Sequence, residues 1–524
     1  MMPTKRSALP KTSGGAKTLT PVVLAAAITM AGCSPDGSAV HSSFDLDRFY
    51  SQQIAWESCE SYTNTSIETA VFALAPTMEC GHLKVPLNYQ EPQGKTALVA
   101  VARVPARGQS IGSLVINPGG PGGSGLFATA ATALALPDGR LTENFDLVGF
   151  DPRGVGSSEP AIECFTDAEA DRGDFMLSTQ GTTQQWTEQD TKGFVDRCAE
   201  RSGGIEVLTS VGTRDAARDI DVLRAVLGDE KLTFLGQSYG TRLGAVYAEQ
   251  FPQNVRAMLL DGAIDSTQGT VERRIGAYAG FQRSFEQMAA YCATETDCPL
   301  GDDPARATEQ FQQIVRPLYG QPVPALSSDL GFDEAIGGVI SGLYSEAAWP
   351  RIIKGISQLQ QGRGDELLQL SYDFSLRDTE GRWPNFVEAL YAINCMDEER
   401  LTEEQGNALR TRIFEDAPFM DPGVALTGAR DGCEQWPVEP TLGIPYATDI
   451  VGLPPTLVVS ITGDPTTPHA GGLALAETLG STLLTVEGEG HTIVMAGTNQ
   501  CVNEIAADYL IDLTLPPAGA SCEL

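Results

Sequence analysis

Residues 232–240 read Leu-Thr-Phe-Leu-Gly-Gln-Ser-Tyr-Gly, and this stretch decides the fold of the chain. An apolar run comes first, a serine between two glycines follows, and residues 241–248 are then typical of a helix. The order predicts a strand, a sharp turn and a helix, with Ser238 at the apex of the turn. Small residues are needed beside the serine because the turn is strained. The pattern predicts a nucleophilic serine whose hydroxyl is lifted clear of a sheet.

A serine hydroxyl needs a neighbouring base to act as a nucleophile, and the base is usually histidine. The chain has four histidines. His491 follows an apolar strand predicted over 482–486 and lies in a flexible loop, where the catalytic residues of parallel sheets gather. His469 is the competitor, near the start of a predicted helix, and we interpret His41 and His82 as structural or exposed. We predict that His491 is the base.

The base in turn needs a carboxylate to orient it. Asp464 comes directly after a strand predicted over 456–461. The chain order Ser238, Asp464, His491 is the order expected in an α/β-hydrolase. Asp261 is the alternative acid, because some members of this fold carry the acid one strand earlier. We predict Asp464 for this position.

A glycine-rich loop precedes these residues. Residues 117–125 read Asn-Pro-Gly-Gly-Pro-Gly-Gly-Ser-Gly and follow a strand predicted over 113–116. Glycines let backbone N–H groups approach a substrate carbonyl, as an oxyanion hole requires. We expect one donor from Gly120, with Gly119 as the alternative, and the other from Tyr239. The loop lacks the Lys-Ser/Thr pair of a phosphate-binding loop.

Short apolar runs alternate with helix-like segments along most of the chain, which predicts an α/β fold with a mostly parallel sheet and helices on both faces. The strands not yet named are predicted over 97–102, 145–150 and 255–260, and a helix is predicted over 213–227. Long helix-like stretches replace this rhythm over 266–440, which predicts an inserted, mainly helical cap. The core of the α/β-hydrolase fold would then comprise residues 51–265 and 441–524.

The first 32 residues have the order of a bacterial signal peptide: basic residues, an apolar segment over 21–30, then Ala-Gly before Cys33. The apolar segment is shorter than the roughly 20 residues that cross a bilayer. Cys33 resembles the lipid-modified cysteine of a lipoprotein, which predicts an anchor on the outer face of the cytoplasmic membrane. Plain secretion is the alternative. Residues 33–50 are expected to form a flexible leader.

Ten further cysteines are an even number, as expected for a disulfide-bonded protein outside the cytoplasm. Neighbours along the chain could pair as Cys59 with Cys80, Cys164 with Cys198, Cys292 with Cys298, Cys395 with Cys433, and Cys501 with Cys522. Their spacing does not fit a zinc site, and the sequence implies neither metal nor cofactor. The formal net charge of −33 argues against nucleic-acid binding, which relies on Lys and Arg.

Several motifs together resemble one known family. They are the glycine loop 117–125, Asp-Pro-Arg-Gly-Val-Gly-Ser-Ser at 151–158, the serine pentapeptide 236–240, Gly463-Asp464 and Gly490-His491. This set is similar to the exported actinobacterial tripeptidyl-aminopeptidase branch of the prolyl-aminopeptidase-like α/β-hydrolases, over about Trp56 to Cys522. Prolyl aminopeptidases usually begin the glycine motif with His, where this chain has Pro118. Proline-specific cleavage therefore does not carry over.

The resemblance implies a serine peptidase that releases short peptides, tripeptides above all, from free N-termini through an acyl-enzyme. Such an enzyme needs a carboxylate to hold the substrate ammonium. Asp397, Glu398 and Glu399 lie in the cap, but we interpret them as a solvated helix face and assign none of them. A carboxylesterase or lipase-like enzyme with the same triad is the second hypothesis. A non-catalytic envelope lipoprotein is the third.

Overall fold

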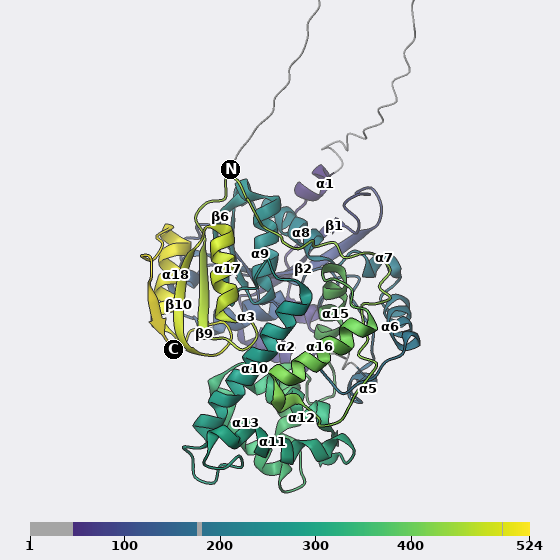
Figure 1. Ribbon diagram of the computed structural model, residues 1–524. Coiled ribbons are helices and arrows are strands. Elements are labelled where there is room, and N and C mark those ends of the chain that lie inside the picture. Colours follow the sequence, from purple (N-terminus) through teal and green to yellow (C-terminus); the bar gives the residue numbers. More distant parts are fainter. Residues whose placement is uncertain (1–45, 175–180, 495) are drawn as a thin grey trace, which may run out of the picture. The chain divides into compact units, whose positions relative to one another are not determined.

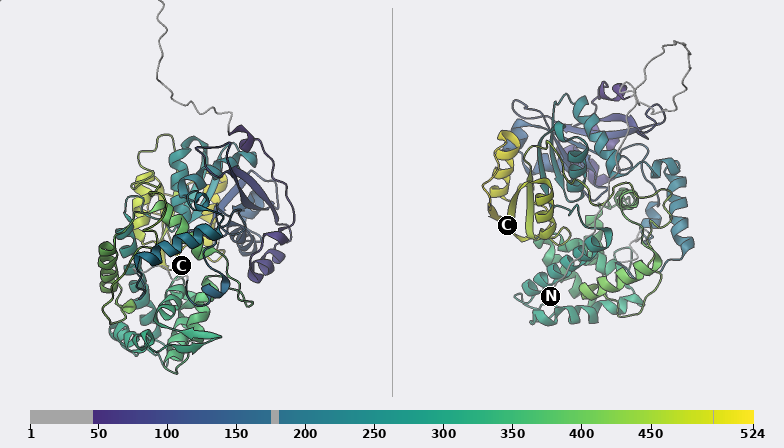
Figure 2. Two further views of the ribbon diagram at one scale, coloured as in Figure 1. Left: turned by 90° about the vertical axis from the view of Figure 1, so that its right-hand side faces the viewer. Right: turned by 45° about the horizontal axis from the view of Figure 1, so that its top comes forward.

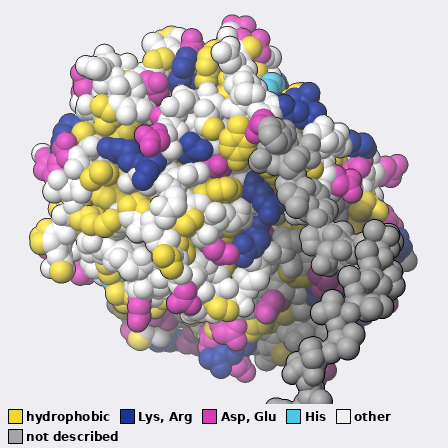
Figure 3. Space-filling model, turned by 90° about the horizontal axis from the view of Figure 1, so that it is seen from above, with side chains coloured by type: hydrophobic (Ala, Val, Ile, Leu, Met, Phe, Trp, Pro, Cys, Tyr) yellow, Lys and Arg dark blue, Asp and Glu magenta, His cyan; other side chains and the backbone are white. Residues whose placement is uncertain are grey.

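The computed structural model describes residues 46–174, 181–494 and 496–524. The expected signal peptide, Cys33, His41 and residues 33–45 of the expected leader lie outside the described residues. The described end of that leader, residues 46–50, contains the short helix α1 (Asp47–Tyr50), in which Phe49 is buried. Among the residues that the structure describes, we find no helix with the length and apolarity of a membrane span. On the face seen in Figure 3, acidic and basic side chains are intermingled.

One nine-stranded sheet organises the core, in the order β1-β2-β4-β3-β5-β6-β9-β10-β11. The strands are β1 (Glu79–Pro86), β2 (Thr96–Val104), β3 (Ser113–Asn117), β4 (Asp146–Phe150), β5 (Leu232–Gln237), β6 (Val255–Asp261), β9 (Leu457–Gly463), β10 (Thr482–Glu489) and β11 (Ser521–Glu523). From β4 to β11 every pair is parallel, whereas β2 is antiparallel to both β1 and β4. The predicted α/β class and mostly parallel sheet are confirmed.

Helices cover both faces of the sheet because alternate strand residues point to opposite sides. In β6, Met258 and Leu260 join one hydrophobic cluster, and Ala257 and Leu259 join another. The first cluster includes residues of α8 (Thr213–Val226), α9 (Tyr239–Gln250) and α17 (His469–Leu479). The second includes α4 (Arg140–Asn144) and α18 (Gln500–Asp512). Figure 1 shows α17 and α18 on opposite sides of β9 and β10.

Helices dominate the segment between β6 and β9, which we call the cap (residues 266–440). It contains α10 (Thr270–Cys292), α11 (Ala307–Val315), α12 (Phe332–Leu343), α13 (Trp349–Leu359), α14 (Asp365–Phe374), α15 (Phe386–Asp397), α16 (Glu403–Asp416) and the hairpin of β7 (Val323–Ala325) and β8 (Ser328–Leu330). Six of these helices share a hydrophobic cluster of their own. Figures 1 and 2 show the helices of the cap grouped below the sheet. The exception, α15, packs on the core through Ala389, Ala392 and Ile393.

Five disulfides join the ten described cysteines. They pair Cys59 with Cys80, Cys164 with Cys198, Cys292 with Cys298, Cys395 with Cys433, and Cys501 with Cys522. These are the neighbour pairs that the order of cysteines along the chain suggests. Each one closes a loop of at most 38 residues, so the bridges act locally.

Candidate active site

Ser238 occupies a strained turn between β5 and α9. Its backbone has φ 55° and ψ −123°, a left-handed conformation that is costly for a residue with a Cβ atom. The flanking glycines are required by close packing. A Cβ atom at Gly236 would collide with the carbonyl oxygen of Gly240, and one at Gly240 would lie 2.6 Å from the carbonyl oxygen of Asn117. The pentapeptide therefore fits this site because α9 and β3 leave no room for larger side chains at its two glycines.

His491 and Asp464 meet just beyond the carboxyl ends of β10 and β9. The imidazole Nδ1 lies 2.8 Å from Oδ2 and 3.0 Å from Oδ1 of Asp464. Asp464 is buried, and its Oδ1 accepts the backbone N–H groups of Thr466 and Thr467 at 3.0 and 2.8 Å. The Thr467 hydroxyl donates to Oδ2 at 2.8 Å and lies 3.2 Å from Nδ1 of His491. These hydrogen bonds from Thr466 and Thr467 fix the carboxylate of Asp464 against the imidazole ring.

The electrostatics of this pair favour a protonated imidazole more than usual. Burial lowers the pKa of His491, but the charge and hydrogen bond of Asp464, with a smaller contribution from Asp261, outweigh burial and raise it above its ordinary value. An imidazole that acts as a base must be neutral before it can accept a proton.

We therefore expect activity to fall on the acid side with an apparent pKa above the ordinary histidine value of about 6.5. As the pH drops through this raised pKa, His491 gains a proton and can no longer take one from Ser238. The measurement is kcat/KM against pH for a p-nitrophenyl ester, which carries no titrating amine. An acid limb centred below the ordinary histidine value would contradict the assignment of His491.

The alternative acid and the other described histidines have different hydrogen-bond partners. Oδ2 of Asp261 accepts the backbone N–H groups of Ile493 and Val494, both at 2.8 Å, so this carboxylate supports the loop after His491. His469 begins α17, with its Nδ1 2.9 Å from the Ser460 hydroxyl. His82, the third of the described histidines, lies on β1 with its Nδ1 3.2 Å from the hydroxyl of Tyr62.

The glycine loop lies directly against the serine turn. A Cβ atom at Gly119 would lie 2.9 Å from both the Ser238 Cβ and the Tyr239 nitrogen. The N–H of Gly119 is already donated to Oδ1 of Asn117 at 3.1 Å. Among the described residues, none accepts the N–H of Gly120 or Tyr239. This favours Gly120 over Gly119 as an oxyanion donor, with Tyr239 as its partner at the first position of α9, where helical N–H groups are unpaired.

A cavity of about 420 Å³ contains Ser238, His491, Gly119 and Gly120 in its wall. Ligand cavities commonly measure about 300–1,000 Å³. The sequence did not identify the other parts of the wall. The cap contributes Tyr344, Phe374, Ser375, Leu376, Pro384, Asn385, Phe386 and Leu390. Helix α2 (Ser66–Leu74) contributes Glu68.

Tyr344 connects the cap to the candidate base. Its carbonyl oxygen accepts the backbone N–H of His491 at 3.0 Å, and its ring lies edge-on to the imidazole at 5.4 Å. The next cap residue, Ser345, forms a backbone bridge with Gly490. No local pattern in the sequence could have identified this role, because Tyr344 and His491 belong to distant segments.

The interpretation of Asp397 and Glu398 as a solvated helix face is wrong, since each is only 2% exposed. Asp397 accepts the backbone N–H and the hydroxyl of Thr213 at 3.0 and 2.5 Å. Glu398 pairs with Arg242, Arg273 and Arg274. The arginines compensate the charge of Glu398 and Thr213 hydrogen-bonds Asp397, so both acids can lie in the interior at the end of α15. Of the three acids, only Glu399 is exposed.

The fold and this site define the class of the chain. It belongs to the α/β-hydrolase family, whose model matches residues 112–498. It is 44% identical over 485 residues to the serine protease Hip1 of Mycobacterium tuberculosis, covering 90% of this chain and 91% of that protein. It is 40% identical over 479 residues to carboxylesterase B of the same organism, covering 90% of each.

A third relative is the tripeptidyl aminopeptidase of Streptomyces coelicolor. The identity is 32% over 482 residues, covering 87% of this chain and 84% of that protein. These relatives and the family confirm that the chain is a serine hydrolase. The resemblance noted in the sequence is confirmed at this level.

Proposed function

We propose that this chain is an exported serine peptidase that releases short peptides, tripeptides above all, from free N-termini. The observation that carries the proposal is the position of Ser238, which shares a cavity with the Asp464-paired His491. The cap contributes the side chains of Phe374 and Phe386 to the wall of this cavity. Five disulfides support export, because such bonds persist in oxidising compartments.

In the proposed reaction, the Ser238 hydroxyl attacks the scissile carbonyl while His491 takes its proton. Asp464 holds the imidazole and stabilises its charged form. The N–H groups of Gly120 and Tyr239 stabilise the oxyanion. His491 then gives the proton to the leaving amine, which leaves an acyl-Ser238. Water, deprotonated by His491, attacks this ester. His491 then returns the proton to the Ser238 oxygen as the short peptide leaves.

The membrane anchor belongs to the same proposal. Cys33 follows Ala-Gly in the order of a lipoprotein signal, so we propose a lipid-anchored protein on the outer face of the cytoplasmic membrane, with secretion as the alternative. Peptides are the proposed substrates.

A carboxylesterase is the second candidate function. Phe374, Phe386 and Leu390 give the cavity an apolar side that suits an acyl chain. The relative named carboxylesterase B supports the same view. Hydrolysis of short esters cannot distinguish the two functions, because esters are easier acyl donors than amides.

We expect the enzyme to cleave an Ala-Ala-Ala p-nitroanilide with kcat/KM about 10- to 100-fold higher than its N-acetyl derivative, since a charge-assisted hydrogen bond to the ammonium contributes about 1.5–3 kcal/mol. Acetylation removes the positive charge and leaves the scissile bond unchanged. The measurement is the release of nitroaniline from both substrates. Equal cleavage would refute recognition of a free N-terminus, and esterase activity alone would then favour the second function.

A further inference from the structure

We propose that Glu68 binds the α-ammonium group of the peptide substrate. The inference rests on the proposed aminopeptidase function and adds to it the residue that recognises the substrate terminus. It is carried by the position, burial and incomplete hydrogen bonding of this side chain.

Glu68 lies in the first turn of α2, outside the segments that carry Ser238, Asp464 and His491. It is only 2% exposed, yet it lines the same cavity as Ser238 and His491. Glu68 therefore borders the space that a substrate would occupy while remaining shielded from bulk water. A buried acid in such a position interacts strongly with any cation that enters the cavity.

One oxygen of Glu68 accepts both of its backbone hydrogen bonds. Oε2 accepts the backbone N–H groups of Asn64 and Thr65 at 2.6 and 3.0 Å, as part of the capping box that begins α2. Oε1 accepts a hydrogen bond from none of the described residues. Nor does Glu68 form an ion pair with any Lys or Arg among them. Oε2 thus holds the carboxyl group in place, and Oε1 could accept a hydrogen bond from a ligand.

The charge of Glu68 is poorly compensated. Burial raises the pKa of its carboxyl group, and the neighbouring charge of Asp151 raises it further, against the backbone hydrogen bonds of Asn64 and Thr65 and the hydroxyl of Thr65. Asp151 itself is satisfied by the Ser124 hydroxyl and the N–H of Ser157, at 2.7 and 2.8 Å. The proximity of two acids, Glu68 and Asp151, favours a cationic ligand in this cavity over a neutral or anionic one.

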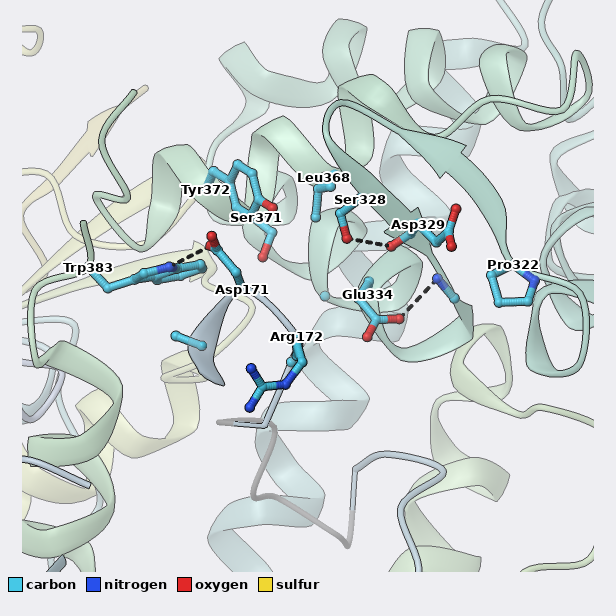
Figure 4. Close-up of a pocket in the computed structure, with 14 residues that line it drawn as sticks. Asp171, Arg172, Pro322, Ser328, Asp329, Glu334, Leu368, Ser371, Tyr372 and Trp383 are labelled. Carbon is cyan, nitrogen blue, oxygen red and sulfur yellow. Dashed lines mark hydrogen bonds between the residues drawn. The ribbon is translucent and has the colours of Figure 1, made fainter. Parts of the chain in front are cut away.

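Three other acids in or beside the cap are already engaged. Glu398 is surrounded by arginines, and Asp397 is bonded to Thr213. In a separate cavity of about 500 Å³ in the described part of the chain, Asp171 accepts hydrogen bonds from Arg377 and from the Trp383 indole (Figure 4). Ser238 does not line that cavity. Glu68 is therefore better suited than these acids to meet a substrate cation beside the nucleophile.

A substrate cation could also be a basic side chain rather than the terminus. The α-ammonium fits the exopeptidase better, because every substrate carries it whatever its sequence. An ammonium fixed by Glu68 would also limit how many residues reach from it to Ser238. The release of short peptides of restricted length would follow from this geometry.

The test is Glu68→Gln in the full chain. Glutamine keeps a carbonyl oxygen for the N–H groups of Asn64 and Thr65, but it removes the negative charge and offers an NH₂ group to the cavity. We expect kcat/KM for Ala-Ala-Ala p-nitroanilide to fall about 10- to 100-fold, mainly through KM. Cleavage of the N-acetyl derivative and of p-nitrophenyl butyrate should stay within about threefold of wild type, as expected for substrates without the ammonium.

Glu334→Gln is the matched control. Glu334 occupies the same capping position at the start of α12, where its Oε2 accepts the N–H of Gly331 at 3.0 Å, but it lies in the separate cavity (Figure 4). The Glu334→Gln variant should keep the wild-type preference for a free N-terminus. Glu68→Asp, which keeps the charge, should retain part of that preference and guards against a purely structural effect of the Gln variant.

The outcomes separate the inference from the proposed function. A folded Glu68→Gln enzyme that keeps the wild-type ratio between free and acetylated substrates overturns the inference and leaves the aminopeptidase intact. A wild-type enzyme without the preference refutes both. If Glu68→Gln instead loses activity only on N-acetyl-Ala-Ala-Lys p-nitroanilide, Glu68 recognises a basic side chain, and its assignment to the ammonium is wrong.

Discussion

Replacing Ser238 by alanine is expected to lower kcat for a peptide anilide about 10⁶-fold, the loss typical of a removed serine nucleophile. Alanine keeps the Cβ atom and the strained backbone, so the turn and the N–H of Tyr239 should stay in place. What is lost is the atom that forms the acyl-enzyme. The small activity that remains would come from the oxyanion donors and from substrate binding.

Two measurements make this test specific. A fluorophosphonate probe should label wild type at Ser238, as mapped by mass spectrometry, and should not label the alanine variant. Ser371→Ala is the control, because this hydroxyl lies in the separate cavity of the cap (Figure 4). Full labelling of Ser238→Ala, or activity above about one per cent of wild type, contradicts a triad enzyme. Absence of labelling in folded wild type would instead favour the non-catalytic lipoprotein.

The sheet and the serine turn could be predicted because their signals are local. An apolar run, a Gly-x-Ser-x-Gly turn and a following helix fall within 17 residues, at 232–248. Asp464 and His491 could be placed because each follows its own strand. The direction of β2 could not be predicted, because burial on both faces makes a strand apolar whether its neighbours are parallel or antiparallel.

The residues that line the cavity could not be predicted from the sequence, for a different reason. Thr65-x-x-Glu68 is recognisable as the start of a helix, but nothing local shows that α2 lies beside the candidate nucleophile. Likewise, Asp397 is the last residue of α15 and Glu398 follows it, in an acidic run of a kind that is usually solvated. Their burial depends on Arg242 and Arg273, which come from distant segments.

Replacing Asp464 by asparagine is expected to lower kcat about 10⁴-fold. The side chain would keep an oxygen for the N–H groups of Thr466 and Thr467, so the loop should remain folded. Its NH₂ group, however, would donate to Nδ1 of His491. The imidazole would then carry its proton on Nε2 and present an N–H, rather than a lone pair, to Ser238.

Asp265→Asn is the matched control. Oδ1 of Asp265 accepts the N–H and the hydroxyl of Thr267 at 2.8 and 2.6 Å, which resembles the turn at Asp464 without a histidine. Its kcat should stay within a few-fold of wild type. The residual activity of Asp464→Asn should also show its acid limb at lower pH, because the carboxylate that raises the pKa of His491 is gone.

Asp261→Asn decides between the two candidate acids. This change weakens the support of Ile493 and Val494 and should destabilise the loop, but it leaves the charge beside Nδ1 of His491. We therefore expect a smaller shift of the acid limb than in Asp464→Asn, and a kcat that recovers at temperatures where the loop is folded. Full turnover by Asp464→Asn together with a 10⁴-fold loss in Asp261→Asn would move the acid of the triad one strand earlier.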